Sequence, residues 1–308
     1  MEDSLLPSFK TSILAATLGF GALLAPNAIR AEVPQHLRFE AYFGGLHVAD
    51  VAIDLTRDEE TRSFKNGLRV QTRGLADWVF GLRAKSDSMG SLSADGPLPD
   101  RFVSAYTNSK REREIATRFR ARGDLAESQV RTWEAPDEPG IRAESDRPAP
   151  EEIEGPREDV TEDMRRGVID PLSGLVAGLE FVADNPMVGK RRSVPVFDGK
   201  RRYDMVWTIT EETTKTIDGE ARDVWVLTFG TDPLAGFRKK WEPRWREREF
   251  ELFIAKGDQP VPLQIWPKND GPVVNLVEIC QGPCPLPDPS GSAPSGEDRA
   301  EKAADQAS

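Results

Sequence analysis

Apolar and polar residues alternate along most of the chain from Leu37 onward, which is the two-residue period of β-strands. In the first run, Leu37–Phe43, every second residue is apolar, and Gly44-Gly45 supplies a turn into a second run, Leu46–Leu55. Further strands are predicted at Leu68–Arg73, Arg83–Leu92, Phe102–Asn108, Glu112–Arg122, Leu125–Trp133, Ser193–Phe197, Arg201–Ile209, Val224–Phe229, Glu249–Ala255, Val261–Trp266 and Val273–Cys280. Dipeptides typical of turns separate several runs, namely Asn66-Gly67, Asp95-Gly96, Gly123-Asp124 and Asp198-Gly199. The pattern predicts a mainly β protein with one curved antiparallel sheet, barrel-like or spiral.

Two segments interrupt the strand pattern. In the segment Asp170–Ala183, Asp170 can cap a helix, Pro171 fits the first helical position, and apolar residues recur at helical spacing. We predict one short helix here, packed against the sheet. The segment Gly74–Gly81 is apolar but too short for a full helix. We interpret it as a buried apolar turn whose Trp78 closes one end of the sheet.

The beginning of the chain predicts export. An uncharged apolar run, Ile13–Ala25, is too short to span a bilayer and is typical of a signal-peptide core. We predict that residues 1–31 are a signal peptide, cleaved near Ala31, and that the protein is periplasmic. No second apolar run of membrane length follows, so no transmembrane anchor is expected after cleavage. The mature chain is predicted to hold a single β-rich domain, residues 32–284, and a disordered tail, residues 285–308.

The net charge of −11 is concentrated in two segments. Residues 134–164 carry 12 acidic and 3 basic side chains, and residues 285–308 carry 5 acidic and 2 basic ones. We predict that the first of these segments is an acidic loop. The remaining mature chain has 33 acids and 34 bases, so it lacks the basic excess of a surface that binds nucleic acid. Nucleic acid is therefore not an expected partner.

Several ordered segments together resemble one protein family. They are Thr72–Gly81, Asp170–Leu175 and Pro195–Asp204, accompanied by Tyr42–Ala49 and Asp258–Leu263. From Leu37 to about Leu276, the chain resembles the exported bacterial family known as domain of unknown function DUF3108. This resemblance implies an envelope protein of antiparallel β-structure that has no established activity.

Cys280 and Cys284 are the only cysteines of the chain. In an oxidising compartment, two cysteines this close predict a small disulfide loop at the end of the last strand. A second interpretation is a copper-handling pair with His36 or His47 as a third ligand, because soft sulfur ligands favour copper. No thioredoxin-like order of strand and helix surrounds the pair. We therefore favour the disulfide and predict neither a bound metal nor another cofactor.

The sequence gives little support for catalysis. No nucleophile elbow, phosphate-binding glycine loop or His-Glu-x-x-His helix occurs, and the chain has only two histidines. Asp170, Asp198 and Asp204 lie in the family-like segments and could supply a carboxylate pair for acid–base hydrolysis. Asp170 already has an explanation as a helix cap and Asp198 as a turn former. A non-catalytic role is therefore favoured over an enzyme.

The segment Phe237–Arg248 interleaves basic and aromatic side chains. Its candidates for stacking on sugars or binding anionic lipid headgroups are Trp241, Arg244, Trp245 and Arg246. The alternative is a solvated edge strand whose charges prevent sheets from aggregating.

The hairpin near Asp198 adds three ligand-binding candidates and the predicted apolar turn adds a fourth: Arg201, Arg202, Tyr203 and Trp78. On a strand, alternating side chains place Arg201 and Tyr203 on one face and Arg202 on the other. A buried arginine needs a carboxylate, so we predict that one of the two arginines pairs internally with an acid such as Asp77 or Asp170.

These features favour a non-catalytic periplasmic protein that binds or scaffolds components in cell-envelope maintenance. Its expected partner is an envelope component, either an amphipathic lipid or glycan or another envelope protein. The alternatives are an envelope hydrolase that uses carboxylates and a copper-handling protein that uses Cys280 and Cys284.

Overall fold

The structure is a computed structural model that describes residues 35–58, 60–93, 96–119, 125–136, 140–184, 186–217, 219–257 and 260–287. These residues all belong to the unit formed by residues 32–308. The predicted signal peptide and most of the predicted tail lie outside the described residues. Within the described ranges, no helix has the length and apolar character that a membrane span requires.

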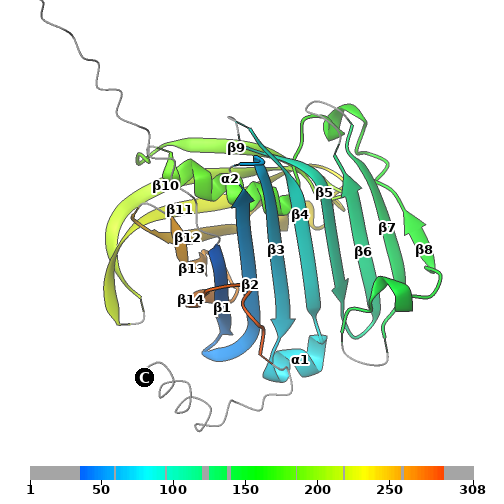
Figure 1. Cartoon of the computed structure of the whole chain (residues 1–308), viewed down its shortest axis with the longest axis horizontal. Coiled ribbons are helices and arrows are strands. Elements are labelled where there is room, and N and C mark those ends of the chain that lie inside the picture. The colour runs from blue at the N-terminus through cyan, green and yellow to red at the C-terminus, as the bar shows by residue number, and fades with distance from the viewer. Residues whose placement is uncertain are drawn as a thin grey trace, which may run out of the picture. The chain divides into compact units, whose positions relative to one another are not determined.

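One antiparallel sheet contains the fourteen strands found in the described residues (Figure 1). The strands are β1 (Gln35–Phe43), β2 (Leu46–Asp58), β3 (Ser63–Thr72), β4 (Arg83–Ser93), β5 (Gly96–Thr107), β6 (Arg111–Arg118), β7 (Glu127–Glu134), β8 (Glu152–Glu154), β9 (Arg191–Phe197), β10 (Arg202–Ile217), β11 (Glu220–Ala235), β12 (Glu249–Ala255), β13 (Val261–Pro267) and β14 (Val273–Cys280). Consecutive strands are neighbours, except that β1 pairs with β14 and thereby joins the two halves, while β8 and β9 are the two edges. The predicted mainly β class and curved antiparallel sheet are confirmed, and the sheet is open.

The turn dipeptides have different outcomes. Gly44 and Gly45 link β1 to β2 with φ of +56° and +82°, and Gly199 links β9 to β10 with φ of +93°. The prediction of a turn at Asn66-Gly67 is wrong, because both residues lie inside β3 and pair with β2 on one side and β4 on the other. Continuous pairing on both sides keeps this segment extended despite its turn-forming composition. Gly123-Asp124 lies outside the described residues.

Helix α2 (Pro171–Ala183) confirms the predicted helix. Asp170 caps it by accepting hydrogen bonds from the amides of Leu172 and Ser173, each at 2.9 Å. The helix contacts β3, β4 and β5 as well as β9 and β10, so it lies between the two halves of the sheet (Figure 1). This position explains why the curved sheet encloses a core instead of a solvent channel.

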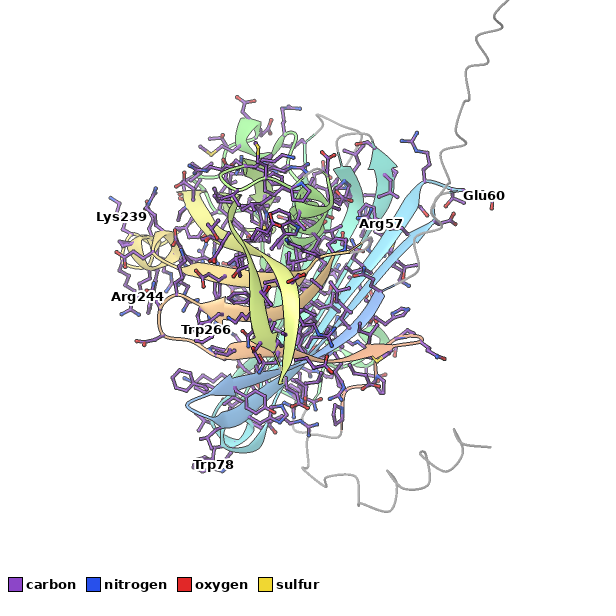
Figure 2. The ribbon with its side chains drawn as sticks, turned by 90° about the vertical axis from the view of Figure 1, so that its left-hand side faces the viewer. Arg57, Glu60, Trp78, Lys239, Arg244 and Trp266 are labelled. Atoms are coloured by element: carbon purple, nitrogen blue, oxygen red, sulfur yellow. A yellow bond between two sulfur atoms is a disulfide. The ribbon has the colours of Figure 1, made fainter. Side chains whose placement is uncertain are left out.

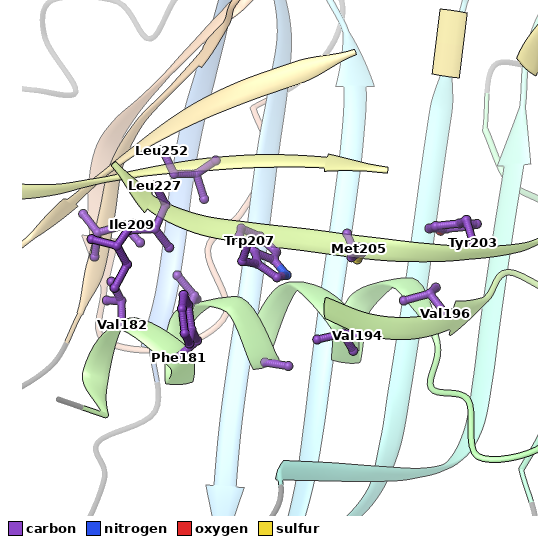
Figure 3. Close-up of a cluster of buried hydrophobic side chains, with 13 residues drawn as sticks. Phe181, Val182, Val194, Val196, Tyr203, Met205, Trp207, Ile209, Leu227 and Leu252 are labelled. Carbon is purple, nitrogen blue, oxygen red and sulfur yellow. The ribbon is translucent and has the colours of Figure 1, made fainter. Parts of the chain in front are cut away.

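The largest hydrophobic cluster forms where α2 meets β9–β12 (Figure 3). Trp207 on β10 is completely buried in it. A Cβ atom added at Gly178 would lie 2.4 Å from the Trp207 ring, and one added at Gly174 would lie 2.5 Å from the Met205 sulfur. These two glycines therefore allow the helix backbone to approach β10 more closely than any larger residue would.

The predicted buried apolar turn is wrong. Residues Gly74–Phe80 form a short helix, α1, none of whose residues is buried, and Trp78 is 86% exposed. The helix is attached to the sheet by its carboxylate: Asp77 accepts hydrogen bonds from the Thr72 hydroxyl at 2.8 Å and from Arg83 at 2.5 Å. With this polar side chain turned toward the sheet, the apolar side chains of α1 are left in solvent.

The acidic segment 134–164 is only partly the predicted loop. It contains β8, which pairs with β7, and two 3₁₀ turns, Glu144–Asp146 and Asp163–Arg165. Its basic residues attach it to the sheet, because Arg142 and Arg147 bind the buried Glu112 of β6 at 2.7 and 3.0 Å. The net charge of the segment does not reveal these contacts, because the carboxylate that Arg142 and Arg147 bind lies far away in the sequence.

Candidate functional site

A cleft of about 440 Å³ lies between β5, β6 and β8 on one side and the segment after β11 on the other. Its walls carry five arginines and four aromatic rings: Arg111, Arg113, Arg157, Arg201, Arg238, Tyr106, Phe237, Trp241 and Trp245. Glu152 and Glu154 are the carboxylates among its lining residues. We call this site the arginine cleft.

Strand register assembles the first wall of the arginine cleft. Tyr106 on β5 pairs with Arg113 on β6, which pairs in turn with Thr132 on β7. Thr132 then pairs with Glu152 on β8. Directly paired residues project from the same face of a sheet, so a ring, a guanidinium and a carboxylate form one row. Arg111 lies two residues before Arg113 on β6 and therefore shares this face.

A bend at Gly236 positions the second wall. Its φ is +84°, a Cβ there would lie 2.6 Å from the Lys200 carbonyl oxygen, and its amide donates to Asp159 at 2.8 Å. The next residue, Phe237, meets Trp245 edge to face with ring centroids 5.5 Å apart. The Arg201 guanidinium lies 5.1 Å from the Trp245 centroid. This cation–π contact holds a positive charge against the aromatic wall.

The segment Phe237–Arg248 contains a short helix, α3 (Glu242–Arg246), and the alternative of an edge strand is wrong. Pro243 lies in the first turn of α3, where its missing N–H costs nothing, whereas in a strand it would remove a ladder hydrogen bond. The Arg244 guanidinium lies 4.7 Å from the Trp241 centroid. Arg246 binds Asp232 at 2.6 Å on the exposed surface.

The arginine cleft has an excess of positive charge that internal pairing does not neutralise. The hydrogen bond from Lys200 lowers the pKa of Glu154, so this carboxylate stays ionised and engaged with the lysine. Over the described part of the chain, Arg111, Arg157 and Arg238 form no ion pair. Their positive charges therefore face the cleft and are hydrated by solvent instead of being paired with carboxylates.

The structure brings three predicted ligand-binding residues, Arg201, Trp241 and Trp245, together in the arginine cleft. Arg244 and Arg246 lie on the neighbouring helix α3 but do not line the cleft. Figure 2 places Trp78 at the lower extremity of the unit, well below Arg244, so Trp78 belongs to a separate surface.

The remaining candidates near Asp198 have structural roles. Tyr203 is buried in the core, and burial raises its pKa well above the ordinary value. Arg202 binds Asp204 at 2.6 Å, and Arg201 lies 3.7 Å from Asp198. The predicted pairing of an arginine with an acid is confirmed, but the partners are Asp204 and Asp198 of the same hairpin and not Asp77 or Asp170.

Sequence reasoning missed most of the first wall, namely Tyr106, Arg111, Arg113 and Arg157. A signal was present in Arg111-Glu112-Arg113-Glu114, since strand alternation places the two arginines on one face and the two acids on the other. Glu112 and Glu114 bind Arg147 on their face, which leaves the arginine face available to the cleft.

The carboxylates proposed for hydrolysis do not form a pair. Asp170 is buried as the cap of α2, where burial raises its pKa. Asp198 accepts hydrogen bonds from the amides of Lys200 and Arg201 in the β9–β10 turn. Asp204 is the partner of Arg202. Each carboxylate is thus occupied in a different structural contact.

Cys280 and Cys284 form the predicted disulfide, with Cα atoms 5.6 Å apart. His36 pairs in register with Cys280, but its Nδ1 atom lies 2.8 Å from Asp54 Oδ1. Sulfur atoms bonded to each other are not thiolate ligands, so the copper interpretation requires prior reduction of this bond.

A second group, Glu40, His47 and Asp50, has its potential ligand atoms within 4.8 Å of one another. Two arginines already bind its carboxylates: Arg38 lies 3.3 Å from Glu40, and Arg73 binds the buried Asp50. Arg38 also binds Glu278 at 3.0 Å, and because guanidinium groups already pair with both carboxylates, we assign the group as an ion-pair network at the β1–β2 hairpin.

Comparisons with known proteins give a family but no activity. No curated protein matches the chain. A crystal structure described as a beta-barrel-like protein of domain of unknown function DUF1849 from Brucella abortus is similar to it, with a TM-score of 0.47 and 12% sequence identity, covering 80% of this chain and 97% of the other. The model of the family described as protein of unknown function (DUF3108) matches residues 38–271. Since this match spans most of the folded region, the chain belongs to the DUF3108 family.

Proposed function

We propose that this protein is an exported, non-catalytic binding protein of the cell envelope, and that the arginine cleft binds an anionic envelope component. The ligand carries a phosphate or carboxylate on a sugar or on a lipid headgroup. The observation that carries this proposal is the cluster of arginines without ion pairs, Arg111, Arg157 and Arg238, that lines one cleft with aromatic rings.

The two walls of the arginine cleft supply complementary chemistry. Guanidinium groups bind phosphate and carboxylate with two parallel hydrogen bonds, so Arg111 and Arg113 suit the charged part of the ligand. The faces of Trp241 and Trp245 suit the flat or apolar part, as aromatic residues do in many ligand sites. Glu152 adds an acceptor for hydroxyl groups on the first wall.

The cleft carboxylates give weaker support to hydrolysis. A general acid must hold a proton near neutral pH, whereas the Lys200 hydrogen bond lowers the pKa of Glu154. Among the described lining residues, this leaves Glu152 without a second carboxylate free to complete an acid–base pair. We therefore favour binding.

Binding to the cleft is tested with charged and neutral probes. We expect the purified protein to bind glucosamine 6-phosphate or short-chain phosphatidylglycerol, measured by calorimetry, and not glucosamine or short-chain phosphatidylcholine. Arg111→Glu combined with Arg238→Glu is expected to weaken this binding by about 100-fold or more, because hydrogen bonds to charged groups are worth roughly 1.5–3 kcal/mol each. Binding of only one anionic probe would identify its source as sugar or lipid.

A matched control separates the cleft from general charge. Arg101→Glu combined with Arg118→Glu makes the same charge change on an exposed cross-strand pair of β5 and β6 outside the cleft. We expect this variant to bind like the wild type. Equal losses in the two double variants, or equal binding of neutral and anionic probes, would refute the role of the cleft.

A further inference from the structure

A second surface, distinct from the arginine cleft, gathers large apolar side chains in solvent. Helix α1 and the β1–β2 turn present them, with exposed fractions from 51% to 86%: Phe43, Leu46, Leu75, Trp78, Val79 and Phe80. We call this surface the apolar tip. An exposed apolar surface of this kind marks an interaction site in a folded protein.

The apolar tip is firmly attached, although its own side chains are not packed. The Arg73 amide donates to the Val48 carbonyl at 2.9 Å, which fixes the start of α1 against β2. Asp77 holds the middle through Arg83, and the Ser109 amide donates to the Phe80 carbonyl at 3.2 Å. The structure thus maintains the exposed helix with polar contacts on its inner side.

Shape and charge indicate what covers the apolar tip. Figure 2 shows Trp78 at an extremity of the unit, so the tip projects from it. Lys110 follows Ser109, whose amide binds the Phe80 carbonyl, in the β5–β6 turn; it is exposed and forms no ion pair within the described residues. Asp77 is neutralised by Arg83. A projecting apolar surface with the basic residue Lys110 at its border is complementary to an anionic bilayer.

We infer that the apolar tip docks the protein on the interface of a bilayer that contains anionic lipid. Tryptophan and phenylalanine side chains enter the headgroup region, where a polar protein edge stays hydrated. Lys110 then lies at the level of the phosphates. The inference uses a different surface from the proposed function, so either can fail without the other.

Sedimentation with vesicles tests this inference. The wild type is expected to sediment with vesicles of phosphatidylethanolamine and phosphatidylglycerol and to sediment less with phosphatidylcholine alone. Trp78→Ser combined with Phe80→Ser is expected to reduce binding about tenfold or more, since both side chains supply the buried apolar area. Because these side chains are exposed, circular dichroism should confirm an unchanged fold. Lys110→Glu is expected to weaken binding to the anionic vesicles only.

Trp266→Ser is the matched control, because Trp266 is also an exposed tryptophan, at 46%, but lies on β13. It should bind vesicles like the wild type. The cleft variant with Arg238→Glu alone should also retain vesicle binding, which distinguishes the tip from the cleft. No sedimentation of the wild type, or undiminished sedimentation of the Trp78→Ser and Phe80→Ser variant, would overturn the inference. The first result would direct attention to a protein partner, and the second to another lipid-binding surface.

Discussion

Replacing Gly178 with leucine is expected to destabilise the protein by about 3 kcal/mol or more, because overpacking a closed core commonly costs about 1–3 kcal/mol and here the clash is with a large ring. A Cβ at this position would already lie 2.4 Å from the completely buried Trp207. The helix is held on its other side by β3, β4 and β5, so it has no room to withdraw. Urea denaturation monitored by tryptophan fluorescence measures the change.

Two comparisons test the cause of this loss. Gly155→Leu adds the same side chain where a Cβ meets no atom within 4 Å, and its effect should stay within about 0.5 kcal/mol. In a double-mutant cycle, Gly178→Ala and Trp207→Phe should couple favourably, because the smaller ring makes room for the methyl group. Additive effects in that cycle would show that the contact between Gly178 and Trp207 does not limit the packing of α2.

Replacing Asp170 with alanine is expected to cost about 2–4 kcal/mol, the sum of a lost helix cap and of buried donors left with fewer partners. Asp170 accepts hydrogen bonds from two backbone amides of α2 and from the hydroxyl groups of Ser88 and Ser173, at 2.7 and 2.6 Å. It therefore ties the start of α2 to β4 as well as capping the helix. Chemical denaturation provides the measurement.

Asp163→Ala serves as the control, because the Asp163 side chain is 97% exposed and should contribute no more than about 0.5 kcal/mol. Asp170→Asn should cost less than Asp170→Ala, since its amide oxygen still accepts from the helix amides and the serine hydroxyls can turn to accept. If the alanine variant were as stable as the wild type, the cap would have no role in holding α2.

The pH dependence of stability gives a further check on Asp170. Burial raises the pKa of this carboxyl above its ordinary value of 3.8, against the opposing effect of its hydrogen bonds. The folded protein then binds a proton more tightly than the unfolded chain does. This contribution is complete below pH 3.8 and is lost as the pH rises through the folded pKa. The stability of the wild type relative to Asp170→Asn should therefore fall as the pH rises, and a rise would contradict the assignment.

The arginine cleft was partly predictable. The segments around Arg201 and Trp245 stand out because bases and aromatic residues are adjacent in sequence there. The arginines of β6 were missed, because they reach the cleft only through the pairing of β5, β6, β7 and β8 and through the bend at Gly236. Composition within a window carries no information about such contacts between distant segments.

Local patterns in the sequence were sufficient for the β class, the turn at Gly44-Gly45, the capped helix after Asp170 and the disulfide, because each depends on residues close together in the chain. Tertiary contacts settled the rest. Arg83 holds Asp77 on the side of α1 that faces the sheet, and this orientation leaves Trp78 exposed instead of buried. Likewise, Asn66-Gly67 became strand because β2 and β4 both paired with it. Hydrogen bonds to partners outside the segment itself outweighed local preference at both places.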